Sequence, residues 1–270
     1  MKKAPSIRPK KTTKKQVLKL VSYIVFLLTW VAAAAIASQL IVGSFLTSIL
    51  SPEALGQPVW TAVYSAISYV LAMALIVLAP IAIIRAKNKR EDENALYNIN
   101  EIDHEELGFK NYPTWTDIGL AVVGFLIYLV VSAGIMYLFS LFPWFNAEET
   151  QNVGFSYYLI GFDRLVAFVT LVVVAPIAEE IIFRGWLYGK MRNALLSQLS
   201  DQASMIISIL LVSILFGLLH MQWNVGVNVF ALSLVLCGLR EVTGTIHAGI
   251  MLHMVKNGVA FYMLYVLGVM

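Results

Sequence analysis

The chain has 270 residues, of which 59% are hydrophobic and 13% are charged. Soluble domains carry about 25% charged residues, so this composition excludes an ordinary soluble domain and predicts a membrane protein that has the lipid bilayer as a partner. The single cysteine, Cys237, excludes an intramolecular disulfide and gives little support to a thiol nucleophile.

The formal net charge of +3 is unevenly distributed, because eight of the nineteen Lys and Arg residues lie among the first nineteen residues. A basic arm can bind nucleic acid, but one that directly precedes a hydrophobic span is typically a topogenic signal. We therefore interpret residues 1–16 as a basic cytoplasmic tail and expect no nucleic-acid partner. The expected location is the cell membrane, with several spans and a cytoplasmic N-terminus.

A membrane-spanning helix needs about 20 apolar residues. Such segments predict an all-α polytopic transmembrane bundle of about seven spans, within a range of six to eight. Their approximate bounds are 18–42, 59–84, 117–142, 164–190, 203–220, 225–239 and 243–267. The first two spans and a polar cytoplasmic loop form the region 17–116, and residues 117–270 form the remaining helical core. Arg240 and Glu241 are interpreted as the turn between the last two spans.

The fourth span ends in three ionisable residues, Glu179, Glu180 and Arg184, after a run without any ionisable residue. Ionisable groups at such a depth are costly and are functional candidates by default. Glu180 and Arg184 are four residues apart and can form an ion pair on one helix face, which leaves Glu179 free to face a cavity. We also expect this helix to continue through Lys190, because a shorter helix would leave Glu179 far from His220.

Three histidines lie in or beside the last hydrophobic segments. His220 follows Phe216 by one helical turn, and we expect Phe216 to pack near the site. His253 and Asn257 are also one turn apart and share a helix face. His247 points to roughly the opposite face from His253, so we interpret it as a packing or hydrogen-bond partner.

These groups suit water-mediated hydrolysis. Glu179 and a histidine can activate one water molecule, while His253 and Asn257 can donate hydrogen bonds to the oxyanion that forms on an amide carbonyl. This glutamate-type route requires no cofactor. Alternatively, Glu179, His220 and His253 could bind a divalent metal such as zinc, although no compact H-E-x-x-H motif is present. The residues alone leave both routes open.

The motifs resemble those of the CAAX-processing and bacteriocin-processing intramembrane proteases, the CPBP or Abi family, which includes the Ras-converting CAAX endopeptidases. The family patterns E-E-x-x-x-R, F-x-x-x-H and H-x-x-x-N occur in the family's order on successive hydrophobic segments. The matching residues are Glu179, Glu180 and Arg184, then Phe216 and His220, then His253 and Asn257. The resemblance covers roughly residues 117–267.

The resemblance implies that residues 117–270 form a catalytic helical core with an intramembrane active-site cavity. It implies an intramembrane endopeptidase whose substrate is a peptide or a protein C-terminal segment, as in CAAX-type processing. It implies that Glu179 and His220 activate water and that His253 and Asn257 form the oxyanion site. Glu180 and Arg184 would support and orient these groups, and metal dependence stays open. Lys256 departs from the expected pattern, since an apolar or small residue would cost less to bury between His253 and Asn257.

A second hypothesis is a non-catalytic membrane protein, for example a bacteriocin-immunity or regulatory protein that binds a peptide in the same cavity. Four intact groups, Glu179, His220, His253 and Asn257, favour the enzyme, because binding alone would not require all of them. A proton-coupled transporter would also bury carboxylates and histidines. The lack of an internal sequence repeat argues against that class.

Overall fold

The computed structural model describes residues 13–80, 106–147, 149, 155 and 159–268. Throughout these residues the regular structure is helical, as the sequence predicts. The first twelve residues of the predicted cytoplasmic tail lie outside the described residues, and so does most of the predicted polar loop up to residue 105.

Within the part of the chain that the structure describes, seven helical stretches correspond to the seven predicted spans. The first two contain α1 (Lys14–Ile49), the short α2 (Pro52–Leu55), α3 (Pro58–Met73) and the π-helical segment η1 (Ala74–Leu78). The third is α5 (Trp115–Ser140). The fourth contains α6 (Gly161–Phe168), η2 (Val169–Val174), α7 (Ala175–Glu180), η3 (Ile181–Leu187) and α8 (Tyr188–Leu196). The last three are α9 (Asp201–Leu218), α10 (Trp223–Thr243) and α11 (His247–Tyr265).

Local sequence signals set several of the helix ends. Thr13 accepts a hydrogen bond from the backbone N–H of Gln16, whose side chain accepts from the Thr13 N–H, forming a capping box at the start of α1. Thr114 and Asp117 form the same arrangement at the start of α5. Gly244 ends α10 because it adopts a left-handed conformation with φ of 69°.

The fourth span is one continuous helical rod from residue 161 to residue 196, which confirms the prediction that it continues through Lys190. Within it, the π-helical segments η2 and η3 lie on either side of α7, which carries Glu179 and Glu180. π-Helical turns occur frequently at functional sites because they shift the direction of side chains relative to a regular helix.

The turn between the last two spans lies later than the sequence suggested. Arg240 and Glu241 are part of α10, and the chain turns at residues 244–246. Partners outside the helix keep both residues helical: Arg240 donates to the backbone oxygen of Glu106, and Glu241 accepts from Tyr188. The interpretation of these charged residues as a turn is therefore wrong.

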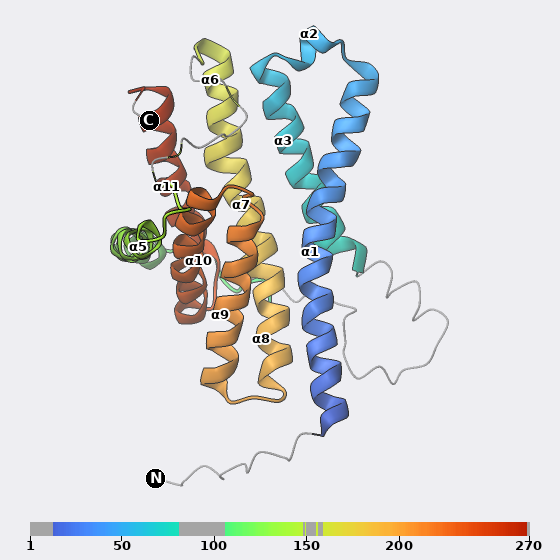
Figure 1. The fold of residues 1–270 in the computed structure, drawn as a ribbon, viewed down its shortest axis with the longest axis vertical. Helices are drawn as coiled ribbons and strands as arrows, with labels where there is room; N and C mark the ends of the chain where they lie inside the picture. The colour runs from blue at the N-terminus through green and yellow to red at the C-terminus, as the bar shows by residue number, and fades with distance from the viewer. Residues whose placement is uncertain (1–12, 81–105, 148, 150–154, 156–158, 269–270) are drawn as a thin grey trace.

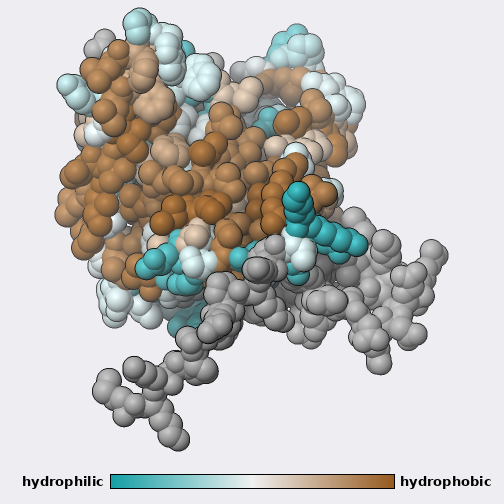
Figure 2. Space-filling view, turned by 60° about the horizontal axis from the view of Figure 1, so that its bottom comes forward, coloured by the Kyte–Doolittle hydropathy of each residue, from teal (hydrophilic) through white to brown (hydrophobic). Residues whose placement is uncertain are grey.

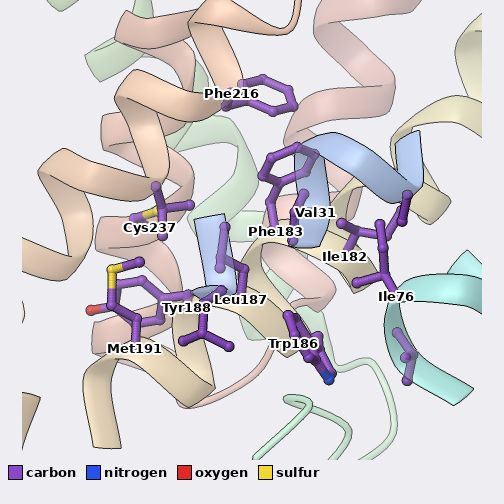
Figure 3. Close-up of a cluster of buried hydrophobic side chains, with 14 of the residues drawn as sticks. Val31, Ile76, Ile182, Phe183, Trp186, Leu187, Tyr188, Met191, Phe216 and Cys237 are labelled. Carbon is purple, nitrogen blue, oxygen red and sulfur yellow. The ribbon is translucent and has the colours of Figure 1, made fainter. Parts of the chain in front are cut away.

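Most of the helices lie side by side in a bundle (Figure 1). Helix α1 packs against α3 and α8, α5 against α10 and α11, and α9 against α8 and α10. α9 and α10 approach closely at Gly217 and Gly226, where a Cβ atom on Gly217 would lie 2.8 Å from the backbone oxygen of Gly226. The largest buried cluster joins α1, α3, η1, η3, α8, α9 and α10, and its members include Phe183, Leu187 and Phe216 (Figure 3).

Among the described residues, six helices are long and apolar enough to cross a membrane. Helix α11 is not among them, because His247, His253, Lys256 and Asn257 make it more polar. Hydrophobic residues cover the middle of the surface seen in Figure 2, and hydrophilic residues gather toward its ends. The chain is a multi-pass membrane protein.

Candidate functional site

A cavity of about 250 Å³ lies where α3, the fourth helical rod, α10 and α11 meet. It contains both charged and apolar groups and lies beside the middle of the fourth rod. The residues that line it are Ser65, Tyr69, Leu171, Ala175, Glu179, His220, Gln222, Val225, Val229, His253, Lys256, Asn257, Ala260, Phe261, Leu264 and Tyr265. The four predicted catalytic residues, Glu179, His220, His253 and Asn257, are thus brought to one cavity from distant parts of the sequence.

Glu179 is the acidic residue of this lining, and its side chain is 12% exposed. The Tyr69 hydroxyl on α3 donates to its Oε1 atom at 2.7 Å. Its Oε2 atom lies 3.6 Å from Nε2 of His253, which is longer than a hydrogen bond. One carboxylate oxygen is therefore held by Tyr69, while the other faces a histidine across a short gap.

Glu180 points away from the cavity and forms the predicted ion pair with Arg184. The Oε1 atom of Glu180 and the Nη1 atom of Arg184 are 2.9 Å apart, and their side chains are 0% and 1% exposed. The guanidinium also stacks on the ring of Phe216, with Cζ 4.5 Å from the ring centroid. The paired acids of the motif therefore differ: Glu180 belongs to the buried core and Glu179 to the cavity.

Helix α11 approaches α7 closely enough for the His253 ring to lie between Glu179 and Glu180. Nδ1 of His253 donates to Oε1 of Glu180 at 3.0 Å, which leaves Nε2 facing Glu179. Gly249, one turn earlier, permits this approach, because a Cβ atom there would lie 3.1 Å from Oε2 of Glu180. A buried charged pair thereby fixes the orientation of the imidazole ring, as hydrogen-bonded carboxylates do for histidines in many functional sites.

His220 lies in the turn between α9 and α10. Its Nδ1 atom is 2.8 Å from the backbone oxygen of Phe216, and a carbonyl can only accept, so Nδ1 carries the proton. In the neutral ring, Nε2 is then the acceptor. Met221 follows with φ of 56°, a conformation that non-glycine residues seldom adopt, and it lies in the turn between α9 and α10. This turn allows both His220 and Gln222 to reach the cavity.

Phe216 packs beside the site, as expected from its motif. Its ring lies edge to face with that of Phe183, with centroids 4.8 Å apart, and the two rings are neighbours in Figure 3. It also contacts the His220 ring at 5.0 Å and the His253 ring at 6.0 Å. Phe216 therefore separates the buried ion pair from the cavity and supports both histidines.

Asn257 is positioned by a backbone carbonyl of the fourth rod that lacks its helical hydrogen-bond donor. In η2, the N–H of Ala175 donates to the oxygen of Thr170, five residues earlier. The next bond in this register would reach the oxygen of Leu171, but residue 176 is proline and has no N–H. Nδ2 of Asn257 donates to that oxygen instead, at 2.9 Å. The amide nitrogen keeps a second N–H for another acceptor.

Sequence reasoning missed Tyr69, because the resemblance does not extend to α3. The one available signal was weak: Ser65 and Tyr69 are four residues apart in an apolar span and share a helix face. His247 lies away from this cavity, with Nε2 2.6 Å from the backbone oxygen of Asn111, so it is the hydrogen-bond partner that the sequence predicted.

The geometry does not favour the alternative metal set of Glu179, His220 and His253. Among the described residues, no three His, Cys, Asp or Glu side chains converge closely enough to hold one metal ion. His253 also uses Nδ1 on Glu180, and its Nε2 atom lies 3.6 Å from a carboxylate oxygen of Glu179. As they are arranged, these three side chains therefore do not fit a metal ion.

Comparison with known proteins agrees with the motifs. Residues 161–259 match the model of the family described as type II CAAX prenyl endopeptidase Rce1-like. This segment extends from the start of α6 into α11 and contains Glu179, His220, His253 and Asn257. No curated protein and no solved structure matches the chain significantly. Over residues 161–259, the chain is therefore similar to the Rce1-like family of CAAX prenyl endopeptidases.

Proposed function

We propose that the protein is an intramembrane endopeptidase that hydrolyses a peptide bond near the C-terminus of a substrate protein. The observation that carries this proposal is the convergence of Glu179, His220, His253 and Asn257 on one cavity among apolar helices. The Rce1-like match over residues 161–259 independently supports a CAAX-type endopeptidase. The substrate is therefore a peptide or a protein segment that enters from the membrane or its cytoplasmic face.

Glu179 is proposed as the general base. Its Oε1 atom accepts from Tyr69, so Oε2 is the atom available to a water molecule in the cavity. The Nε2 atom of His220 is an unprotonated acceptor in the neutral ring, because Nδ1 donates to Phe216. A water molecule held by both groups would lose its proton to the carboxylate as its oxygen attacks the carbonyl carbon.

Asn257 and His253 are proposed to stabilise the oxyanion that this attack forms. The second N–H of the Asn257 amide is free to donate, while the first stays on the oxygen of Leu171. Nε2 of His253 can donate when the ring is protonated, and Glu180 holds the ring in place through Nδ1. Donors that are fixed before the reaction stabilise developing charge without a reorganisation cost. Proton return to the amine would release the C-terminal fragment.

The N-terminal basic residues support a cytoplasmic N-terminus in the cell membrane. Residues 13–19 at the start of α1 include Lys14, Lys15 and Lys19, all of them exposed. Positive residues next to a span favour the cytoplasmic side. Cysteine accessibility to a membrane-impermeant reagent, after placing a cysteine at Lys15 in a Cys237→Ala background, tests this orientation; labelling of intact cells would contradict it.

The direct test is cleavage of a peptide library by protein in liposomes, read by mass spectrometry. We expect one or a few peptides to be cleaved near their C-termini, and cleavage to persist after treatment with a strong chelator. Loss of activity on chelation, with recovery on adding zinc, would show that a metal takes part. Saturable peptide binding without cleavage would instead support the immunity or regulatory hypothesis.

His220→Gln is expected to lower kcat by at least about a hundredfold, because it removes the imidazole acceptor that shares the water. The matched control is His247→Gln, since His247 is a histidine whose side chain contacts the backbone of Asn111 away from the cavity. Both variants are to be compared with wild type by kcat and thermal unfolding. Equal activity of His220→Gln and His247→Gln at equal stability would contradict the role of His220.

Tyr69→Phe is expected to lower kcat by about tenfold while KM changes little. The hydroxyl positions Glu179 rather than contacting substrate, and one hydrogen bond to a charged group is worth about 1.5–3 kcal/mol. Tyr64→Phe on the same helix is the control, because Tyr64 is not part of the cavity lining. A Tyr69→Phe variant with the kcat of wild type at equal thermal stability would remove Tyr69 from the mechanism.

A further inference from the structure

Lys256 is a cation inside the proposed catalytic cavity, and the proposed water-activating and oxyanion groups do not account for it. It is half-buried and lines the cavity together with His253 and Asn257. Among the lining residues of the described chain, it is the one lysine or arginine, and Glu179 is the one acid. Lys256 forms no ion pair or hydrogen bond through its side chain with any other residue that the structure describes.

The placement of Lys256 follows from helical spacing. The residues of α11 that line the cavity recur at intervals of three and four, so they form one stripe along the helix. They are His253, Lys256, Asn257, Ala260, Phe261 and Leu264. Lys256 therefore lies within one turn, about 5.4 Å along the axis, of the residues proposed to bind the oxyanion.

A lysine in such surroundings loses hydration, and this cost is offset when an anion enters beside it. A peptide has no negative charge on its backbone except at its free C-terminus. We propose that Lys256 binds the free C-terminal carboxylate of the substrate and thereby sets where the chain is cut. This inference rests on the proposed function, because it assigns a specificity role within the same cavity.

The dimensions of the site limit where that carboxylate lies. An extended peptide advances about 3.3–3.6 Å per residue. Because Lys256 is within about one turn of the oxyanion residues, the carboxylate must lie only a few residues beyond the bond that is cut. The ammonium therefore selects a substrate end, whereas an internal segment of a long chain would bring no backbone carboxylate to Lys256 and would leave Glu179 as the one acid of the described cavity lining.

The test compares two forms of one cleaved peptide, with either a free C-terminal carboxylate or a C-terminal carboxamide. We expect wild type to prefer the carboxylate form by about tenfold or more in kcat/KM, the size of one charge-assisted hydrogen bond. In Lys256→Met this ratio should fall close to one, and Lys256→Arg should keep most of it. Lys19→Met is the matched control, since it makes the same change at an exposed position on α1, and it should keep the wild-type ratio.

Adding residues beyond the cleaved bond gives a second measure. In wild type, the preference for the carboxylate form should decline as the added residues move the carboxylate further from the cleaved bond. This decline should be absent in Lys256→Met. A ratio near one in wild type would overturn the proposal. So would a Lys256→Met variant that cleaves both forms more slowly by the same factor, because this would mean that the lysine acts on Glu179 or on the fold.

Failure of the proposed function has a different signature. If no peptide is hydrolysed, the binding of fluorescent carboxylate and carboxamide peptides to wild type and Lys256→Met still tests the lysine. A carboxylate preference that disappears in Lys256→Met would keep the binding role without the protease. Equal binding of both forms by both proteins would reject the binding role.

Discussion

Glu179→Gln is expected to lower the rate of peptide hydrolysis by between about a hundredfold and ten-thousandfold, the range typical for removing a general base. The amide can still accept the hydrogen bond from Tyr69 through its oxygen, so the side chain should keep its place on α7. It cannot take up the proton of the attacking water. The measurement is kcat in liposomes, together with peptide binding by fluorescence anisotropy.

Binding by Glu179→Gln should stay close to that of wild type, because the variant keeps the size of the side chain and the rest of the cavity lining. Glu53→Gln is the control, since Glu53 is an exposed glutamate on α2, and it should hydrolyse peptides at the wild-type rate. A Glu179→Gln protein that keeps more than a tenth of the wild-type rate would contradict the general-base role. Loss of both binding and hydrolysis would indicate a damaged cavity instead.

The sequence predicted those features of the molecule that depend on spacing within one helix. The i, i+4 spacing of Glu180 and Arg184 predicted their ion pair, and it left Glu179 for the cavity. The requirement that Glu179 and His220 meet predicted the long fourth rod. Each of these expectations uses helical geometry and the cost of charge in an apolar environment, both of which can be derived without coordinates.

Contacts between helices could not be derived in the same way. The bond from Tyr69 to Glu179 joins residues 110 positions apart, and a tyrosine in an apolar span can equally well pack in a core or lie at the membrane interface. The bond from Asn257 to Leu171 depends on the π-helical register of η2, which no side-chain pattern indicates. Pro176 was visible in the sequence, but which carbonyl it frees follows only from the backbone.

The role of His253 also became clearer with the structure. The sequence placed it with Asn257 on one helix face, and both line the cavity. It did not predict that one imidazole would lie between both acids of the first motif, with Nδ1 on Glu180 and Nε2 toward Glu179. The buried ion pair of Glu180 and Arg184 is therefore connected to the cavity through the ring of His253. We expect a substitution in the pair to affect the hydrolytic rate as well as stability.

Arg184→Met is expected to lower the free energy of unfolding by about 3–5 kcal/mol, because it leaves the carboxylate of Glu180 buried without its cation. The loss of the stacking contact with Phe216 adds to this effect. Removing the acid as well, in Glu180→Gln/Arg184→Met, should recover part of the loss, since no uncompensated charge then stays in the core. Denaturant unfolding in detergent micelles measures these differences.

Asp201→Ala provides the comparison with an exposed ion pair. Asp201 contacts Arg192 at 2.6 Å, but its side chain is 78% exposed, so the substitution should cost less than about 1 kcal/mol. The double variant Glu180→Gln/Arg184→Met should also lose hydrolytic rate even where its stability is recovered, because the neutral amide no longer holds the Nδ1 atom of His253 as firmly as the carboxylate. Recovery of both stability and rate would show that the pair acts only in folding, whereas recovery of stability alone would connect the buried pair to the orientation of His253.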